Sequence, residues 1–202
     1  MNPLRPDHAV IASLITPNAR VLDVGCGNGA LLGWLRDHKQ VDGRGIEIDQ
    51  QLVHRAIAHG IPVIQGDVIS DLPHYPDQSY DYVILGQALQ AMTDPVAVLN
   101  QLVRIGKQAI VSVPNFGHWK NRLYLALFGK MPVTKTLSYQ WYDTPNIHFC
   151  TITDFVILAE KLGITIEDRI VVDTAGHKGK FSGRGRWANL LGEQGVFLLS
   201  KR

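Results

Sequence analysis

The sequence predicts an α/β fold: a mostly parallel sheet with helices on both faces. Two observations predict it. Short runs rich in β-branched residues alternate with amphipathic stretches along the chain, and several of those stretches carry helix-capping residues at their ends. Strict alternation of strand and helix is typical of a parallel sheet that is buried on both faces. With 202 residues, of which 46% are hydrophobic, we expect residues 1–202 to form one domain.

The elements follow in order along the chain. The expected strands are 20–24, 45–48, 62–65, 82–85, 109–113, 164–172 and 195–199, and the expected helices are 30–38, 51–59, 95–104 and 152–162. The third helix has Asp94 as N-cap, Pro95 at its first position and Gly106 as terminator. Thr151 and Asp154 form a T-x-x-D start for the fourth helix. A glycine-rich, basic loop is expected to join the last two strands.

Composition excludes several classes of function. Twenty Lys and Arg against eighteen Asp and Glu leave a net charge of +2, which gives no argument for a polyanionic partner. Cys26 and Cys150 cannot form a disulfide framework, and the opening residues lack a signal-peptide pattern, so we expect a cytoplasmic protein. No apolar run approaches the roughly 18 residues that a membrane-spanning helix needs, so no membrane association is expected.

A glycine loop follows the first expected strand. Gly25, Gly27 and Gly29 stand where the strand turns into a helix, which is where open α/β sheets bind ligands. Gly25, Gly27 and Ala30 also fit the dinucleotide pattern G-x-G-x-x-G/A, which is weak by itself. Asp23 separates the two interpretations, because its carboxylate would repel a pyrophosphate and attract the ammonium and sulfonium of S-adenosylmethionine (SAM). The loop therefore favours SAM over NAD.

Two further acids follow the next strands. Glu47 ends the second strand, where a carboxylate can accept hydrogen bonds from both ribose hydroxyls, with Asp49 as the reserve candidate. Asp67 follows the third strand and could bind the adenine amine, while Val68 packs on the ring. Cys26 is interpreted as a small filler rather than a nucleophile. The expected ligand-binding residues are Asp23, Gly25, Cys26, Gly27, Gly29, Glu47, Ile48, Asp67, Val68 and Gln87.

The motif Asp23-x-Gly25-x-Gly27-x-Gly29, with Glu47 and Gly66-Asp67, resembles the class I SAM-dependent methyltransferases over roughly residues 10–115 and the closing strands. This resemblance implies a Rossmann-like, seven-stranded sheet with its last strand antiparallel. Four longer strings resemble the MetW family of methionine-biosynthesis proteins over nearly the whole chain. They are Gln87-Ala88-Leu89-Gln90-Ala91-Met92, Pro114-Asn115-Phe116-Gly117-His118-Trp119, Gly129-Lys130-Met131-Pro132-Val133 and the segment from Tyr139 to His148.

The second resemblance implies a SAM- or S-adenosylhomocysteine-binding protein of methionine biosynthesis that acts as companion or regulator of a homoserine O-acyltransferase. The alternative is an active methyltransferase on a small molecule. Methyl transfer needs mainly alignment and exclusion of water, so the lack of an identifiable catalytic residue does not decide between them. Leu85-Gly86-Gln87-Ala88 lacks the motif of adenine amino methyltransferases, so base methylation is disfavoured. Catalytic residues stay unassigned.

Half of the aromatic residues lie in residues 115–149, an expected insertion before the last helix. They could close a pocket, form a docking surface, or pack as a local core. The candidates for substrate or partner contact are Asn115, His118, Trp119, Tyr139, Trp141, Tyr142, Asn146 and His148. His118, His148 and Cys150 fit no metal-ligand spacing, so no metal is expected.

Residues 177–187 hold four cations and no acid. An RNA-binding hypothesis can be built on them, because glycines make the loop flexible, cations bind phosphates, and Phe181 or Trp187 could stack on bases. Loops between terminal strands are commonly polar and glycine-rich, which disfavours nucleic acid as the ligand. The preferred interpretation is contact with acidic parts of a protein partner, or with an acyl-CoA phosphate near that partner.

Overall fold

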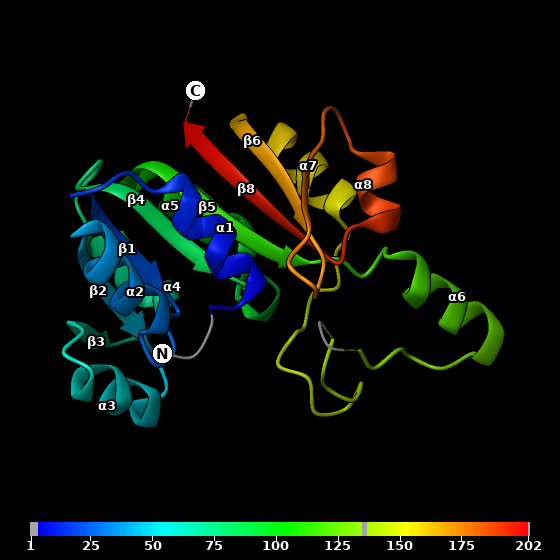
Figure 1. Ribbon diagram of the computed structural model, residues 1–202, viewed down its shortest axis with the longest axis horizontal. Helices are drawn as coiled ribbons and strands as arrows, with labels where there is room; N and C mark the ends of the chain where they lie inside the picture. The colour runs from blue at the N-terminus through cyan, green and yellow to red at the C-terminus, as the bar shows by residue number, and fades with distance from the viewer. Residues whose placement is uncertain (1–3, 135–136, 202) are drawn as a thin grey trace.

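A computed structural model describes residues 4–134 and 137–201 and has one mixed sheet at its centre (Figure 1). The strands follow the order β3-β2-β1-β4-β5-β8-β6-β7. They are β1 (Arg20–Val24), β2 (Asp42–Glu47), β3 (Val63–Gln65), β4 (Tyr80–Gly86), β5 (Gly106–Pro114), β6 (Ile164–Val172), β7 (Lys178–Lys180) and β8 (Gln194–Lys201). The first five strands are mutually parallel, and β8 runs antiparallel between β5 and β6.

The α/β class is confirmed, and the count of seven strands is wrong by one. The extra strand is β7, which lies in the glycine-rich, basic stretch and pairs antiparallel with β6 at the sheet edge. Its three residues are all exposed, so they carry no buried pattern from which a strand could be predicted. The expected antiparallel last strand is β8.

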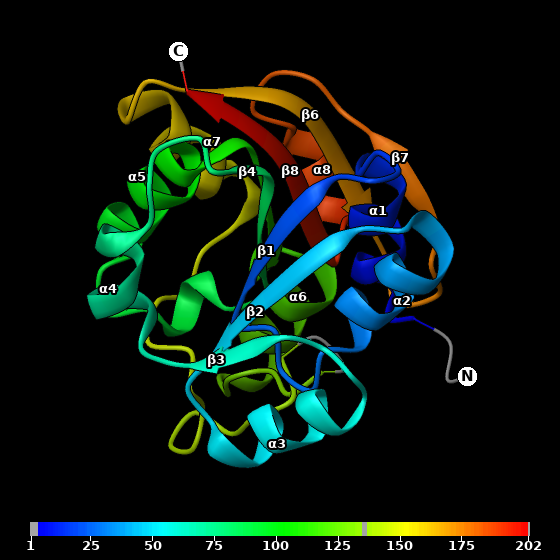
Figure 2. The same cartoon turned by 90° about the vertical axis from the view of Figure 1, so that its left-hand side faces the viewer.

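Helices cover both faces of the sheet (Figure 2). They are α1 (Pro6–Leu14), α2 (Ala30–Lys39), α3 (Gln50–Ala58), α4 (Val68–Asp71), α5 (Pro95–Ile105), α6 (Trp119–Phe128), α7 (Ile152–Lys161) and α8 (Arg186–Leu191), with short 3₁₀ turns η1 (Leu72–His74) and η2 (Leu89–Ala91). One apolar cluster lies between the sheet and α4, α5 and α7, and a second lies between the sheet and α1, α2 and α3.

The predicted caps are present. Asp94 accepts a hydrogen bond from the backbone N–H of Ala97 at the start of α5, and Pro95 occupies the first turn. Thr151 and Asp154 form a complete capping box at the start of α7. Helices α1, α4, α6 and α8 were not predicted. The stretch expected to be a loop between the last two strands contains both β7 and α8.

Candidate functional site

The site lies at the carboxyl ends of the parallel strands, where the strand order reverses. Strands β2 and β3 lie on one side of β1, and β4 and β5 lie on the other. The loops that follow β1 and β4 therefore leave the sheet next to each other, which creates a crevice between them. A Cβ on Gly25, in the first loop, would lie 3.5 Å from the Cβ of Ala88, in the second.

The glycine loop has a left-handed backbone at alternate residues. The φ angles of Gly25, Gly27 and Gly29 are +72°, +58° and +74°, a region that L-residues with a Cβ rarely adopt. A Cβ on Gly29 would lie 3.1 Å from Ile61, whereas a Cβ on Gly27 would meet nothing within 4 Å. Gly29 is thus needed for helix packing, and Gly27 faces open space.

The carboxylate of Glu47 joins the end of β2 to the glycine loop. It accepts hydrogen bonds from the backbone N–H of Gly27 at 2.8 Å, of Ile48 at 2.9 Å and of Asp49 at 3.0 Å. Because a buried polar group is costly unless it is hydrogen-bonded, these three donors stabilise the buried Glu47 side chain and hold it and the loop in fixed positions. The reserve candidate Asp49 instead caps α3 through the N–H groups of Gln51 and Leu52.

Asp23 lies buried in the crevice beneath the loop. Burial raises its pKa to about 7, the neighbouring charges of Glu47 and Asp7 add to the rise, and Arg5 opposes it. Near neutral pH this carboxyl is poised between its two charge states. A cationic ligand placed beside it would favour the ionised form.

Two cavities meet at the glycine loop. The first, of about 640 Å³, is lined by Asp23, Gly25, Cys26, Gly27 and Gly29 together with residues of α1 and α2. The second, of about 500 Å³, is lined by Gly25, Glu47, Ile48, Asp67 and Val68 together with residues around η2. Gln87, with a φ of +58°, lies between Gly86 and Ala88, which line one cavity each. Nine of the ten residues predicted to bind the ligand therefore line the two cavities, and Gln87 lines neither of them.

Individual side chains in this group have local contacts as well. Asp67 caps α4 by accepting from the N–H of Ile69. The thiol of Cys26 packs against Gly45, where an added Cβ would clash with its sulfur. Burial raises the pKa of this thiol well above its ordinary value, with Asp23 and Glu47 adding to the rise. A thiol in this setting stays protonated and is a poor nucleophile.

Residues of α1 were missed by the sequence analysis. Arg5 and His8 line the first cavity, and the Arg5 guanidinium lies 3.0 Å from Asp7 and 2.6 Å from His8. Asp7 is fully buried; one of its oxygens accepts from Ser112, and the other has no hydrogen-bond partner within the described residues. Burial, with Arg5 adding to it, lowers the pKa of His8 to about 4. The sequence signal that could have indicated this helix is Pro6, because proline is common at the first position of a helix.

Residues around η2 were also missed. Ala88, Ala91, Met92 and Thr93 line the second cavity, where Met92 and the alanines give an apolar wall opposite Glu47 and Asp67. Small and apolar residues in a loop carry no sequence signal of binding, so only the fold identifies them.

The aromatic segment lies elsewhere. None of the eight residues predicted for substrate or partner contact lines either cavity at the loop, as far as the described residues go. Asn115 is buried, and its side-chain amide makes four hydrogen bonds. It donates to the carbonyls of Asn189 and Gly192 and accepts from the N–H groups of Gly117 and Ile152. It joins the end of β5 to α7 and α8.

The other seven candidates differ in exposure. His118 is buried at the N-cap of α6, and burial lowers its pKa. Tyr139, Trp141 and Asn146 border a small hollow of about 20 Å³, and His148 lines a separate cavity of about 250 Å³ beside Cys150. Trp119 and Tyr142 are exposed.

The crevice fits an adenosyl ligand. Gly27 leaves room where any other residue would place a Cβ, a buried carboxylate stands in each cavity, and the glycine loop lies between them. In a SAM complex Asp23 would hold the cationic methionine end, and Glu47 the ribose hydroxyls. The bound SAM would supply an electrophilic methyl group.

The fold and the crevice define the class of protein: an α/β chain of the SAM-dependent methyltransferase type. Among solved structures, a Thermotoga maritima protein described as a SAM-dependent methyltransferase, possible histamine N-methyltransferase, has a TM-score of 0.69 at 18% identity and covers 97% of this chain and 88% of its own. A TehB-like SAM-dependent methyltransferase from Corynebacterium glutamicum has a TM-score of 0.63 at 18% identity, over 100% and 90% of the two chains. At such identities the likeness shows the fold.

Within this class, the chain belongs to the MetW family, described as methionine biosynthesis protein MetW, whose model matches residues 5–199. A relative from Rhodopirellula baltica, "Bifunctional methionine biosynthesis protein MetXA/MetW", is 35% identical over 84% of this chain. A Photorhabdus laumondii ubiquinone biosynthesis O-methyltransferase is 35% identical over 71% of this chain and 62% of its own. The chain spans only 29% of the Rhodopirellula protein. Family membership assigns a role in methionine biosynthesis.

Proposed function

We propose that this protein binds SAM or S-adenosylhomocysteine in the crevice and acts as companion and regulator of a homoserine O-acyltransferase. The observation that carries the proposal is the Rhodopirellula relative, in which a chain like this one forms part of a bifunctional MetXA/MetW protein. Fusion keeps two activities at high local concentration, which favours partners that work together. The proposal includes the cytoplasmic location expected from the sequence. In the part of the chain that the structure describes, no helix is long and apolar enough to span a membrane.

A physical connection between the crevice and the aromatic segment supports a regulatory role. Ala91 and Met92 line the second cavity, and the carbonyl of their neighbour Gln90 accepts hydrogen bonds from the N–H groups of Ile147 and His148. The buried side chain of Gln90 also donates to the Pro114 carbonyl and the Cys150 sulfur. A ligand that shifts η2 would therefore act directly on residues 147–150. Feedback requires only that the ligand bind two such arrangements with different affinity.

The alternative is an active small-molecule methyltransferase, which the Photorhabdus relative supports. In that case SAM would supply the methyl group, and Gln87, in the loop after β4, would contact the methyl acceptor or the methionine end of SAM. Both proposals place an adenosyl ligand in the crevice. They differ in whether the bound ligand regulates a partner enzyme or donates a methyl group to a small molecule.

The decisive experiment combines calorimetry with acyltransfer assays. The chain should bind SAM or S-adenosylhomocysteine, co-purify with the homoserine O-acyltransferase of the same organism, and change its rate in an adenosyl-dependent way. Gly27→Val should abolish ligand binding, because the added side chain enters the crevice at a φ of +58°. Gly163→Val is the matched control, since Gly163 has a φ of +68° and equally open surroundings after α7, away from the crevice.

An acyltransferase that neither binds the chain nor responds to it would contradict the companion role. Labelled methyl from SAM on a small metabolite, lost in Gly27→Val and kept in Gly163→Val, would establish the alternative.

A further inference from the structure

Helix α6, the segment that follows it and α8 expose an apolar surface that nothing in the described chain covers. α6 projects beyond the sheet, next to α8 and to the segment that follows it (Figure 1). Trp187 is 75% exposed, Trp141 71%, Leu127 67% and Phe128 61%. The full set, which we call the aromatic surface, is Trp119, Leu123, Tyr124, Leu125, Leu127, Phe128, Val133, Tyr139, Trp141, Tyr142, Ile147, Phe149, Trp187 and Leu191. Large exposed apolar side chains gathered on neighbouring elements are typical of an interaction site.

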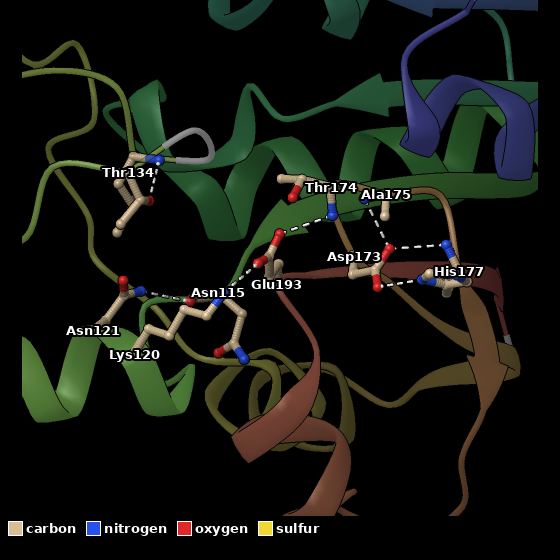
Figure 3. A network of polar contacts seen from close by, with 10 residues as sticks. Asn115, Lys120, Asn121, Thr134, Asp173, Thr174, Ala175, His177 and Glu193 are labelled. Carbon is tan, nitrogen blue, oxygen red and sulfur yellow. Dashed lines mark hydrogen bonds and ion pairs between the residues drawn. The ribbon is translucent and has the colours of Figure 1, made fainter.

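The base of this surface is firmly held. Glu193 lies 3.9 Å from the Lys120 ammonium of α6, its second oxygen accepts from the N–H of Thr174, and its carbonyl accepts from the N–H of Asn115 (Figure 3). The Asn121 amide donates to the Asn115 carbonyl. Phe116 packs on Phe149 with ring centroids 5.1 Å apart. The first turn of α6 is therefore anchored, and its outer half extends without cover.

The shape of α6 favours enclosure by a protein. A helix that lies on a bilayer has its apolar residues along one face. Here Leu123 and Leu127 share one face by their i, i+4 spacing, Tyr124 and Phe128 share the next, and Leu125 lies on a third, all of them exposed. A groove that receives the helix buries all three faces together, which a plane cannot do.

Charge indicates the character of that groove. Among the described residues of 115–149, three are cations, Lys120, Arg122 and Lys130, and one is an acid, Asp143. In a dimer formed through this surface, the cations of one copy would face those of the other, and like charges repel across an interface. A groove with an acidic rim complements both the apolar side chains and the cations around them.

We propose that the aromatic surface is the docking site for the homoserine O-acyltransferase, which receives α6 in an apolar groove rimmed by Asp and Glu. This rests on the proposed function and adds to it the surface that makes the contact. The surface is separate from both crevice cavities, so docking leaves the adenosyl site open. Gln90 connects the adenosyl site to the aromatic surface, because its carbonyl accepts hydrogen bonds from the N–H groups of Ile147 and His148.

The test uses purified chain and purified acyltransferase, with binding measured by biolayer interferometry. Phe128→Asp and Trp141→Asp, on two separate elements, should each weaken binding by about 30-fold or more, as expected for a central aromatic anchor. Ile57→Asp and Ile64→Asp are matched controls, since Ile57 and Ile64 are 54% and 57% exposed on α3 and β3, away from α6 (Figure 1), and should bind as the wild type does. All four variants should bind S-adenosylhomocysteine normally.

Four results would overturn the docking site. If the wild type activates the acyltransferase and both surface variants still bind it unchanged, the proposed function stands and the surface is wrong. If the wild type is a dimer in ultracentrifugation that Phe128→Asp dissociates, the occupant is a second copy. If the wild type floats with phosphatidylglycerol vesicles and the variants do not, the occupant is a lipid surface. A wild type that neither binds nor activates the enzyme overturns both proposals.

Discussion

Asp23 and Glu47 are two buried carboxylates with different roles, which follow from their hydrogen bonds. Glu47 accepts hydrogen bonds from three backbone N–H groups, which fix its carboxyl group at the end of β2. Asp23 lacks such a set, and burial raises its pKa to about 7. Sequence reasoning could predict that both lie at one crevice, because strand ends converge at one edge of a parallel sheet. It could not predict the raised pKa of Asp23, which comes first from burial and is then adjusted by charges that include Arg5 and Asp7, at the start of a helix that was not predicted.

Asp23 should make SAM affinity depend on pH. Only its ionised form attracts the ligand's positive charge, so affinity should fall as pH drops through about 7, by roughly tenfold between pH 8 and pH 6. Asp23→Asn should bind weakly, with little pH dependence over this range. Calorimetric titration at three pH values measures this, with the exposed Asp143→Asn as control. An equally steep profile in Asp23→Asn would show that another group titrates.

The same residue should reduce the stability of the free protein. Because the folded pKa lies above the ordinary value of 3.8, the folded state binds the proton more tightly, and its relative stability declines as pH rises from about 4 to 7. Asp23→Asn should therefore melt at least about 4 °C higher than the wild type at pH 8, and at nearly the same temperature at pH 4.5. Calorimetric melting curves of the ligand-free protein test this. An equal gain at both pH values would contradict the titration argument.

At the scale of elements, the predicted helices and strands are those with a regular local pattern. Strand β6 and helices α2, α5 and α7 were predicted within a residue or two, because buried β-branched runs and caps are local signals. Helix α6 was missed because its apolar residues surround the helix and give no amphipathic period. Helix α1 begins at Pro6 and buries an acid, Asp7, in place of an apolar residue. Both of these helices belong to proposed sites, since α6 carries part of the aromatic surface and α1 contributes His8 to the first cavity.

The capping box of α7 gives a prediction at this scale. Thr151 accepts from the N–H of Asp154, whose carboxylate accepts in turn from the N–H of Thr151. Thr151→Ala should lower the free energy of unfolding by about 1 kcal/mol, since it leaves an N–H of the first turn without its partner. Thr151→Ser keeps the hydroxyl and should lose much less. Urea denaturation measures both, and equal losses would mean that the threonine methyl group is what matters.

At the scale of the whole molecule, the parallel half of the sheet carries the crevice, and the antiparallel half supports the aromatic surface. Strand β8 and α8 hold the base of α6, and η2 lies between the two regions. The sequence could predict the crevice, because the glycine motif is local. It left open whether the aromatic residues form a lid, a core or a docking surface, because that depends on where the chain goes after β5.

The connection through Gln90 predicts a long-range response to ligand. S-adenosylhomocysteine should slow amide hydrogen exchange at Ala88, Ala91, Met92 and Thr93, which line the second cavity. It should also slow exchange at Ile147 and His148, whose N–H groups donate to the Gln90 carbonyl. Exchange mass spectrometry with and without ligand measures this, and α8 serves as an internal control that should not change. Slower exchange confined to the crevice would contradict the connection.

The hydrogen bond from Gly27 to Glu47 has a kinetic consequence. Because both partners belong to the chain itself, this hydrogen bond helps to fix the shape of the glycine loop independently of a ligand's own contacts. Little conformational freedom is then left to lose on association. Encounter with an adenosyl compound should be limited by diffusion through the mouth of the crevice, so such a protein can follow changes in metabolite concentration without a slow ordering step.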